Sequence, residues 1–529
     1  MRFLSIFIAL LLAIPARADT YVRQPAIDVV HYEIELELSD LTDVISGTTR
    51  VHVMMQQDGV SNMWLDFVDM TVDKLLVGGT SKPFIYRDGH LAFDFDRQYT
   101  KHEIAIVEVR YHGKSDKTGL MIGKNRYGKR VFFADNWPDR AHHWFPSIDH
   151  PLDKATVEFT ITAPEKYEVV ANGRLVETRS LMDGRKVTRW SESKPIPTYC
   201  MVIGAAEYSI QPQGSAAGVP LCFYAYPQDS GAAVRKFARS NLVLTYFSAL
   251  IGPYPYEKLA QVESTTRTGG MENASAIFYA ERVFQGTYAG EGPVPHEIAH
   301  QWFGDSITEA DWDHLWLSEG FATYFEALFY EHLEGPESLK RTMTQASEAV
   351  KKYHQTHPAP LIDPELKDLM RKLNALNYQK GAWVLHMLRK VLGDEAFFKG
   401  IRRYYNLYEG KNALTEDFQK VMESVSGAPL GTFFKQWFYR PGWPDYKVSW
   451  RWDEDAGEME ITIQQAQKTG LFDMPLEIAI RSGEQRQVRA FRISAETQTF
   501  RFPLQTRPTA IEIDPDNWVL KSVSVANPQ

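Results

Sequence analysis

The hydrophobic and polar positions alternate along the first part of the chain. Tyr32, Ile34 and Leu36 are separated by glutamates, and the same two-residue period returns at Val157 and further along. A period of two places successive side chains on opposite faces of a strand, so one face is buried and the other is solvated. Residues 19–217 are therefore predicted to form an antiparallel β-sheet domain.

The middle part, residues 218–440, shows a different period. PESLKRTMTQASEAVKKYH follows Gly335, and LNYQKGAWVLHMLRKVLG closes on a glycine. Such start and stop signals mark successive helices, which predicts a mainly helical domain. Alternation then returns with Val448 and Trp450 before an Asp-Ala-Gly turn. We expect a small β-sandwich over residues 441–529, which makes the whole chain a multidomain α+β protein.

The first eighteen residues, MRFLSIFIALLLAIPARA, differ from all three parts. They contain Arg2, a short apolar run, and Ala16-Arg17-Ala18 at their end, which matches a secretory signal with an A-x-A cleavage site. The apolar run is shorter than the roughly 20 residues that a membrane-spanning helix needs. We predict that residues 1–18 are a cleaved signal peptide, that the chain is exported to the periplasm or the extracellular space, and that it has no stable membrane anchor.

Composition narrows the possible partners. Hydrophobic residues make up 44% of the chain, charged residues 24%, and the formal net charge is −9. An acidic chain of this kind is a poor partner for nucleic acid or for an anionic membrane. The two cysteines, Cys200 and Cys222, exclude a cysteine-based metal cluster. They could form a disulfide in an exported protein or remain two small buried residues, and the sequence leaves both options open.

The candidate chemistry lies in the helical part, in the stretch GPVPHEIAHQW. His296 and His300 are four residues apart, so on a helix both rings project from one face and can bind one cation. Glu297 is placed to reach a metal-bound water without being a ligand itself. Further along, Glu319 opens an apolar segment that is typical of a buried helix, where a lone carboxylate is costly unless it is protonated, paired or bound to metal. Two histidines and a glutamate form the ligand set of a catalytic zinc site.

Three motifs in the same order give the chain its resemblance to the gluzincin zinc aminopeptidases of the aminopeptidase N family. Eighteen residues separate His300 from Glu319, as in that family's zinc signature, and Tyr378 lies in a Y-x-K-G stretch where the family has its catalytic tyrosine. The family's G-x-M-E-N exopeptidase motif is matched by Gly269, Gly270, Met271, Glu272 and Asn273. The resemblance implies a thermolysin-like catalytic domain and, because the chain stops after the small β domain, no helical C-terminal domain.

The residue roles follow from this chemistry and from the resemblance. One zinc ion held by His296, His300 and Glu319 would polarise the scissile carbonyl, and Glu297 would act as general base. Tyr378 would donate a hydrogen bond to the oxyanion. By resemblance, Glu272 pairs with the free α-amine of a peptide substrate, while its neighbours in the motif line the extended substrate.

Several positions depart from the family pattern. Many members carry a glutamine or glutamate near the place where this chain has Asp135 and Trp137. Asp135 is therefore a candidate second anchor for the substrate amine, and Trp137 a candidate pocket wall. Asp305 stands where the family often has asparagine, and it is a candidate hydrogen-bond partner for a ligand histidine. Pro295 directly precedes His296, which is best accommodated if the metal-binding helix begins there.

The leading hypothesis is a zinc metallo-aminopeptidase that removes N-terminal residues from peptides with a free N-terminus. Two alternatives remain open: a noncatalytic family member that binds peptides, and a hydrolase of another bond, such as an epoxide. The presence of all five catalytic and metal-binding residues favours the enzyme over the binding protein. The sequence leaves open which side chain is preferred at the cleaved position.

Overall fold

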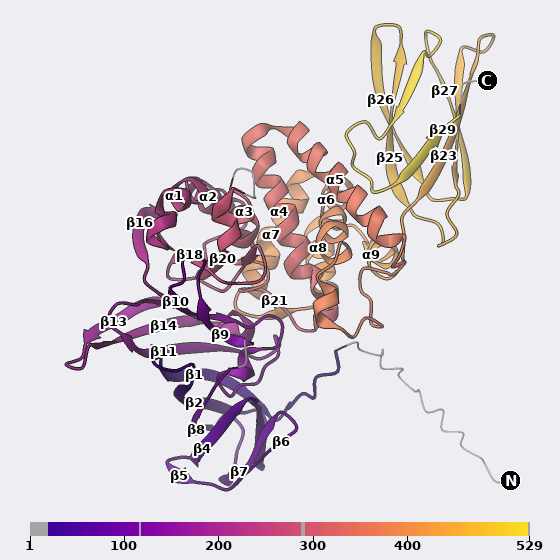
Figure 1. The fold of residues 1–529 in the computed structure, drawn as a ribbon. Helices are drawn as coiled ribbons and strands as arrows, with labels where there is room; N and C mark the ends of the chain where they lie inside the picture. The colour runs from indigo at the N-terminus through magenta and orange to yellow at the C-terminus, as the bar shows by residue number, and fades with distance from the viewer. Residues whose placement is uncertain (1–18, 116–117, 287–290, 527–529) are drawn as a thin grey trace, which may run out of the picture.

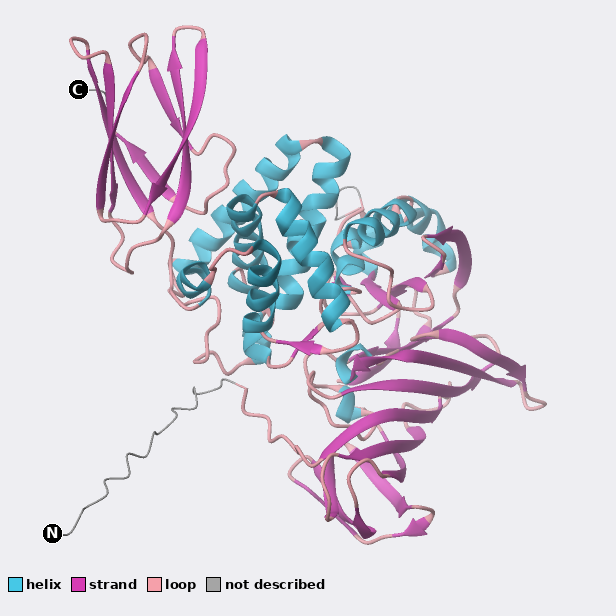
Figure 2. Cartoon of the chain, turned by 180° about the vertical axis from the view of Figure 1, so that it is seen from behind, coloured by secondary structure: helices cyan, strands magenta, loops and turns pink. Residues whose placement is uncertain are grey.

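The structure, a computed structural model, describes residues 19–115, 118–286 and 291–526. Three parts follow one another along the chain (Figure 1). They are an N-terminal part built of strands, a central part with most of the helices, and a C-terminal part built of strands. Seen from behind, the helices form one body between the two regions of strands (Figure 2).

The N-terminal part is organised around a long twisted sheet of eight strands in the order β13-β14-β11-β1-β2-β8-β4-β5. The predicted alternation is confirmed, because Tyr32, Ile34 and Leu36 are at most 1% exposed. Not every pair is antiparallel as expected, since β1 and β11 run parallel. The strands are β1 (Ile27–Glu37), β2 (Ile45–Met55), β4 (Met70–Val77), β5 (Thr80–Ser81), β8 (Ile104–Gly113), β11 (Lys154–Pro164), β13 (Arg174–Ser180) and β14 (Arg185–Pro197).

Two smaller sheets complete the N-terminal part. One of them ends near the candidate site, because its strand β10 finishes at Asp135. It has the order β12-β15-β10-β9 and consists of β12 (Glu168–Ala171), β15 (Ile203–Ala206), β10 (Arg130–Asp135) and β9 (Gly119–Lys124). The other has the order β3-β7-β6 and consists of β3 (Val60–Asp66), β7 (His90–Tyr99) and β6 (Phe84–Arg87).

The central part contains a mixed five-stranded sheet that the helical periods do not predict. Strands β17, β18 and β20 run parallel, and β16 and β19 pair antiparallel at the two edges. The hairpin of β16 and β17 spans the predicted boundary at residues 217 and 218. The strands are β16 (Ser209–Ala216), β17 (Val219–Ala225), β18 (Leu259–Ser264), β19 (Gly270–Met271) and β20 (Ala276–Ala280).

The helices of the central part follow the predicted signals closely. The stretch after Gly335 forms one helix, and residues 230–250 contain two. A short segment of π-helix, η7 (Leu376–Lys380), precedes α6. The helices are α1 (Ser230–Lys236), α2 (Ser240–Leu250), α3 (Val294–His300), α4 (Trp316–Glu334), α5 (Pro336–His354), α6 (Gly381–Leu392), α7 (Asp394–Tyr408), α8 (Thr415–Ser426) and α9 (Gly431–Phe438). A two-stranded parallel pair, β21 (Thr308–Glu309) and β22 (Asn412–Ala413), lies among them.

The C-terminal part forms two facing sheets (Figure 1). It contacts the helices through Trp518, whose ring stacks on that of His386 in α6 with centroids 4.4 Å apart. One sheet consists of β23 (Asp445–Asp453), β24 (Glu458–Gln465), β27 (Thr497–Pro503) and β29 (Ser522–Val525). The other consists of β25 (Met474–Ser482), β26 (Gln485–Ile493) and β28 (Ala510–Ile513).

Two of the predictions made from the sequence concern export and membrane anchoring. The predicted signal peptide, residues 1–18, lies outside the described residues, so its cleavage stays a prediction that the mass of the mature chain would test. Within the described ranges, no helix combines the length and the apolar character needed to cross a membrane.

Cys200 and Cys222 are both free thiols, so the optional disulfide is not formed.

Candidate metal centre and substrate pocket

Helix α3 carries the two candidate ligand histidines. It begins at Val294, and Pro295 occupies its first turn as predicted, where the missing amide proton costs no hydrogen bond. His296 and His300 are four positions apart on this helix, about one turn, so both imidazoles point to the same side. Their Nε2 atoms are 3.1 Å apart.

Helix α4 brings the third candidate ligand to the same point. Glu319 lies in its first turn and is 4% exposed, which confirms the predicted buried helix with an acid near its start. The next residue, Gly320, lies against Gly381 at the start of α6, where an added Cβ would come within 2.8 Å of the Gly381 Cα. Only this close approach of two glycines lets η7 and its Tyr378 lie beside the metal-ligand candidates.

The three side chains form a site that fits a zinc ion. Glu319 Oε2 is 3.4 Å from the Nε2 atoms of both His296 and His300. Ligand atoms about 2.0–2.1 Å from a tetrahedral zinc ion lie about 3.3 Å from one another, so the observed triangle has the required size. Glu319 Oε2 is also buried, and no group in the described part of the chain donates a hydrogen bond to it. A buried carboxylate oxygen of this kind is suited to a cation.

The Nδ1 atoms of both histidines face groups that can accept a hydrogen bond. His300 Nδ1 lies 3.1 Å from the carbonyl oxygen of Phe303 and 3.0 Å from Ser318 Oγ. His296 Nδ1 lies 3.6 Å from a carboxylate oxygen of Glu326. A carbonyl can only accept, so Nδ1 of His300 carries the proton and its Nε2 lone pair is directed at the triangle.

Asp305 does not take the predicted place beside a ligand histidine. It accepts hydrogen bonds from Gln301 Nε2 at 2.8 Å and from Cys200 Sγ at 3.3 Å. Gln301 Nε2 also donates to the backbone oxygen of Glu272 at 2.6 Å. Asp305 thus orients Gln301, which fastens the segment containing Glu272 to the end of the metal-binding helix.

Glu297 and Glu272 are the two further carboxylates of the site. Acceptor atoms of both lie within 4.8 Å of each other and of His300. Burial raises the pKa of Glu297 to about 8 against the opposing effect of the histidines, which suits a group that takes up a proton near neutral pH. Burial also raises the pKa of Glu272, and an ammonium group bound beside it would offset that cost.

Gly270 leaves the space that Glu297 occupies. A Cβ added at Gly270 would come within 2.2 Å of Glu297 Oε1 and 2.4 Å of its Cδ. Only a glycine therefore fits in strand β19 at this position while the carboxylate keeps its place. Gly270 therefore makes room for the side chain of Glu297 on helix α3.

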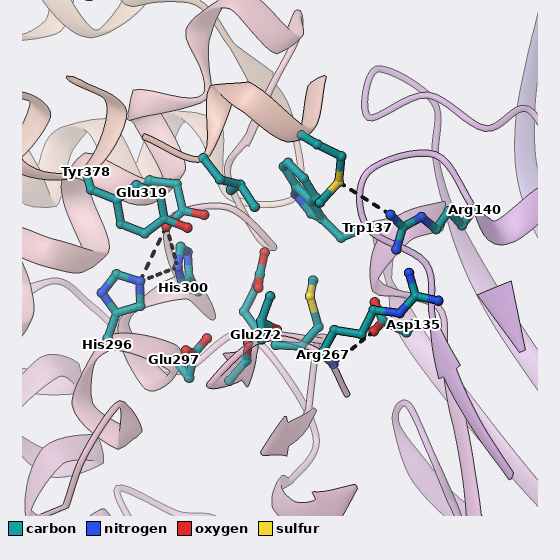
Figure 3. Close-up of a pocket in the computed structure, with 15 residues that line it drawn as sticks. Asp135, Trp137, Arg140, Arg267, Glu272, His296, Glu297, His300, Glu319 and Tyr378 are labelled. Atoms are coloured by element: carbon teal, nitrogen blue, oxygen red, sulfur yellow. Dashed lines mark hydrogen bonds and ion pairs between the residues drawn. The ribbon is translucent and has the colours of Figure 1, made fainter. Parts of the chain in front are cut away.

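In Figure 3, Tyr378 and Glu297 lie on opposite sides of the metal-ligand candidates. The ring of Tyr378 is parallel to that of His296, with an interplanar angle of 5° and centroids 5.9 Å apart. Burial, followed by the nearby Glu319 carboxylate, raises its pKa well above the usual value, so the hydroxyl keeps its proton and can donate it in a hydrogen bond.

One pocket, with a cavity volume of about 110 Å³, joins these groups to the loops of the N-terminal part. Asp135 and Trp137 line it, together with residues that the sequence motifs do not mark. These additional lining residues are Arg140, Arg267, Thr268, Met370 and Leu373.

Two residues of the G-x-M-E-N motif lie outside the pocket lining. The carbonyl oxygen of Gly269 accepts a hydrogen bond from the amide of Ala280 at 3.1 Å. The side chain of Asn273 is fully buried, and neither atom of its amide group has a hydrogen-bond partner among the described residues. The predicted direct contact with substrate therefore has support for Gly270, Met271 and Glu272, which line the pocket.

Comparison with known proteins agrees with this arrangement. The Peptidase M1 N-terminal domain matches residues 29–200, and the Peptidase family M1 domain matches residues 238–437. Together these matches cover more than half of the chain and include the metal-ligand candidates. The chain belongs to the M1 peptidase family.

Three curated proteins illustrate the similarity. A glutamyl aminopeptidase of Bitis rhinoceros is 27% identical over 81% of this chain and 48% of its own length. A probable aminopeptidase 2 of Sulfurisphaera tokodaii is 26% identical over 86% of this chain and 59% of its own length. Tricorn protease-interacting factor F2 of Thermoplasma acidophilum is 24% identical over 87% and 59%, respectively. This M1 chain spans about half the length of the curated relatives it matches.

The space at Gly270 leads to a testable prediction. Gly270→Ala should displace the Glu297 carboxylate and lower the peptidase activity of this M1 chain about 100-fold, because a shift of about 1 Å in a catalytic group costs that much. The metal content should stay unchanged, since His296, His300 and Glu319 are untouched. Activity on an aminoacyl amide and metal analysis check both points.

Gly123→Ala is the matched control, because a Cβ at Gly123 in β9 would meet no atom within 4 Å. It should retain full activity. Equal activities of Gly270→Ala and Gly123→Ala would contradict the steric role of Gly270.

Proposed function

We propose that the protein is a zinc metallo-aminopeptidase that hydrolyses the first peptide bond of peptides with a free N-terminus. The observation that carries this proposal is the position of Glu272. Its carboxylate lies within 4.8 Å of acceptor atoms of Glu297 and His300. An α-ammonium held by Glu272 would therefore leave only the first carbonyl of a peptide within reach of the catalytic groups.

The metal supplies one part of the chemistry. A zinc ion bound by His296, His300 and Glu319 would polarise the scissile carbonyl and increase the acidity of a water molecule. Ser318 and the carbonyl of Phe303 hold His300 in orientation, and Glu326 does the same for His296. We place this centre in a thermolysin-like domain, on the support of a mixed sheet followed by the two helices that carry the ligands.

The chain's own residues supply the proton transfers. Glu297 takes the proton of the attacking water and passes it to the nitrogen of the leaving amine, so that no proton is lost between the two steps. Tyr378 donates a hydrogen bond to the oxygen that becomes negative as the carbonyl is attacked, a contribution typically worth about 3–4 kcal/mol. The buried pocket keeps these groups away from bulk water, which strengthens both interactions.

Glu272 gives the reaction its exopeptidase character. The ammonium group of a substrate would neutralise this buried carboxylate, whereas an internal segment of a chain would leave it without a counterion. Gln301 holds the Glu272 backbone in place. A noncatalytic peptide-binding role receives less support, because the groups needed for hydrolysis are all present and converge on one pocket.

Glu297→Gln tests the proposed general base. The variant should bind zinc like the unmodified protein while its kcat falls about 100- to 10,000-fold, because an amide cannot accept the proton. Glu337→Gln, at an exposed position of α5, is the control for the loss of one charge. Turnover by Glu297→Gln within a few fold of the control would remove Glu297 from this role.

Acetylation of the substrate tests the amine anchor. We expect an N-acetylated peptide to resist cleavage while the free peptide of the same sequence is hydrolysed, since the acetyl group removes the positive charge that Glu272 would bind. Product analysis by mass spectrometry compares the two peptides. Cleavage of both at similar rates would show that Glu272 does not define the reaction.

A further inference from the structure

The far end of the substrate pocket carries two arginines. Arg140 and Arg267 both line it, and Figure 3 shows their guanidinium groups at the same end. In that view Glu272 lies between them and the metal-ligand candidates. The guanidinium group of Arg140 donates to Met370 Sδ at 3.4 Å, and thioether sulfur is a weak acceptor. Asp139, the residue before Arg140, lies close enough for Arg140 to act electrostatically on its carboxylate.

Only one part of a substrate can reach this end, provided that the proposed function holds. With the α-ammonium at Glu272 and the scissile carbonyl at the metal ligands, the first Cα lies between these two points. The peptide continues from the carbonyl, away from Glu272. The side chain of the first residue is thus the group that can extend past Glu272 toward Arg140 and Arg267.

The walls of this end suit a side chain with an apolar stem and a charged tip. Apolar surface in the lining of the pocket comes from Trp137, Met271, Met370 and Leu373. Asp135 also lies at this end, and its Oδ2 accepts hydrogen bonds from Thr266 Oγ1 at 3.2 Å and from the Arg267 amide at 3.5 Å. Two guanidinium groups therefore line this end of the pocket.

We propose that the pocket selects peptides whose N-terminal residue is glutamate or aspartate, and that Arg140 and Arg267 bind the side-chain carboxylate. A guanidinium fork matches the two oxygens of a carboxylate, which makes arginine the residue suited to this contact. Asp135 then serves to hold the loop that carries Arg267, in place of the second amine anchor suggested by its sequence position.

The test compares fluorogenic amides of glutamate, glutamine, leucine and lysine on the zinc-loaded protein. Glutamate and glutamine have the same shape, so their ratio of kcat/KM measures the charge alone. Hydrogen bonds to a charged group predict a glutamate preference of about 10- to 100-fold, which should shrink as the salt concentration rises. Equal rates for glutamate and glutamine, or a preference for leucine or lysine, would overturn the inference.

Substitutions assign the preference to the two arginines. Arg140→Gln and Arg267→Gln should each lower the glutamate-to-glutamine ratio about tenfold or more. Arg174→Gln, at an exposed position of β13, removes the same charge elsewhere and should leave the ratio unchanged. Reduced stability would lower both rates alike and not their ratio, so an unchanged ratio in both pocket variants would contradict the role of these arginines.

The same set of amides distinguishes a failure of this inference from a failure of the proposed function. If no amide with a free amine is cleaved, the proposed function fails, and the selection of acidic residues fails with it. If leucine and glutamine amides are cleaved and glutamate shows no advantage, the aminopeptidase proposal stands and only the inference about the arginines is wrong.

Discussion

The arrangement of the central part depends on one buried carboxylate, that of Glu319, facing two histidine nitrogens. Its Oε2 atom receives no hydrogen bond from the described residues, and an uncompensated charge in the interior costs several kcal/mol. A cation at this point would remove that cost and fix three side chains from two helices. The contact of Gly320 with Gly381, which places Tyr378, and the space left by Gly270, which places Glu297, both serve this same point.

The proposed substrate anchor, Glu272, lies on a separate element, in the loop that follows the short edge strand β19. This loop is tied to the metal-binding helix through Gln301, whose amide contacts Glu272 on one side and Asp305 on the other. The distance between anchor and metal ligands is therefore set by hydrogen bonds within a packed core. In the proposed function, this fixed distance would determine which peptide bond is attacked, while the far end of the pocket would determine which first side chain fits.

The sequence predicts the parts of this site that depend on local geometry. A helix turn accounts for the spacing of His296 and His300, and the apolar segment after Glu319 indicates its burial. The parallel strands of the central sheet could not be predicted in the same way, because β18 and β20 are buried on both faces and show no alternation. Arg140 and Arg267 belong to loops that meet only in the folded protein. The position of Arg267 just before the G-x-M-E-N motif is the one signal that could have marked it.

The metal content of the purified protein tests the central claim most directly. Mass spectrometry of the native protein should find one zinc ion per chain, and Glu319→Gln, which keeps the shape of the side chain and removes its charge, should weaken zinc binding substantially. The Glu337→Gln protein should keep its zinc. A chain that takes up no zinc when the ion is supplied, or a Glu319→Gln protein that binds it as tightly as the control, would contradict the account.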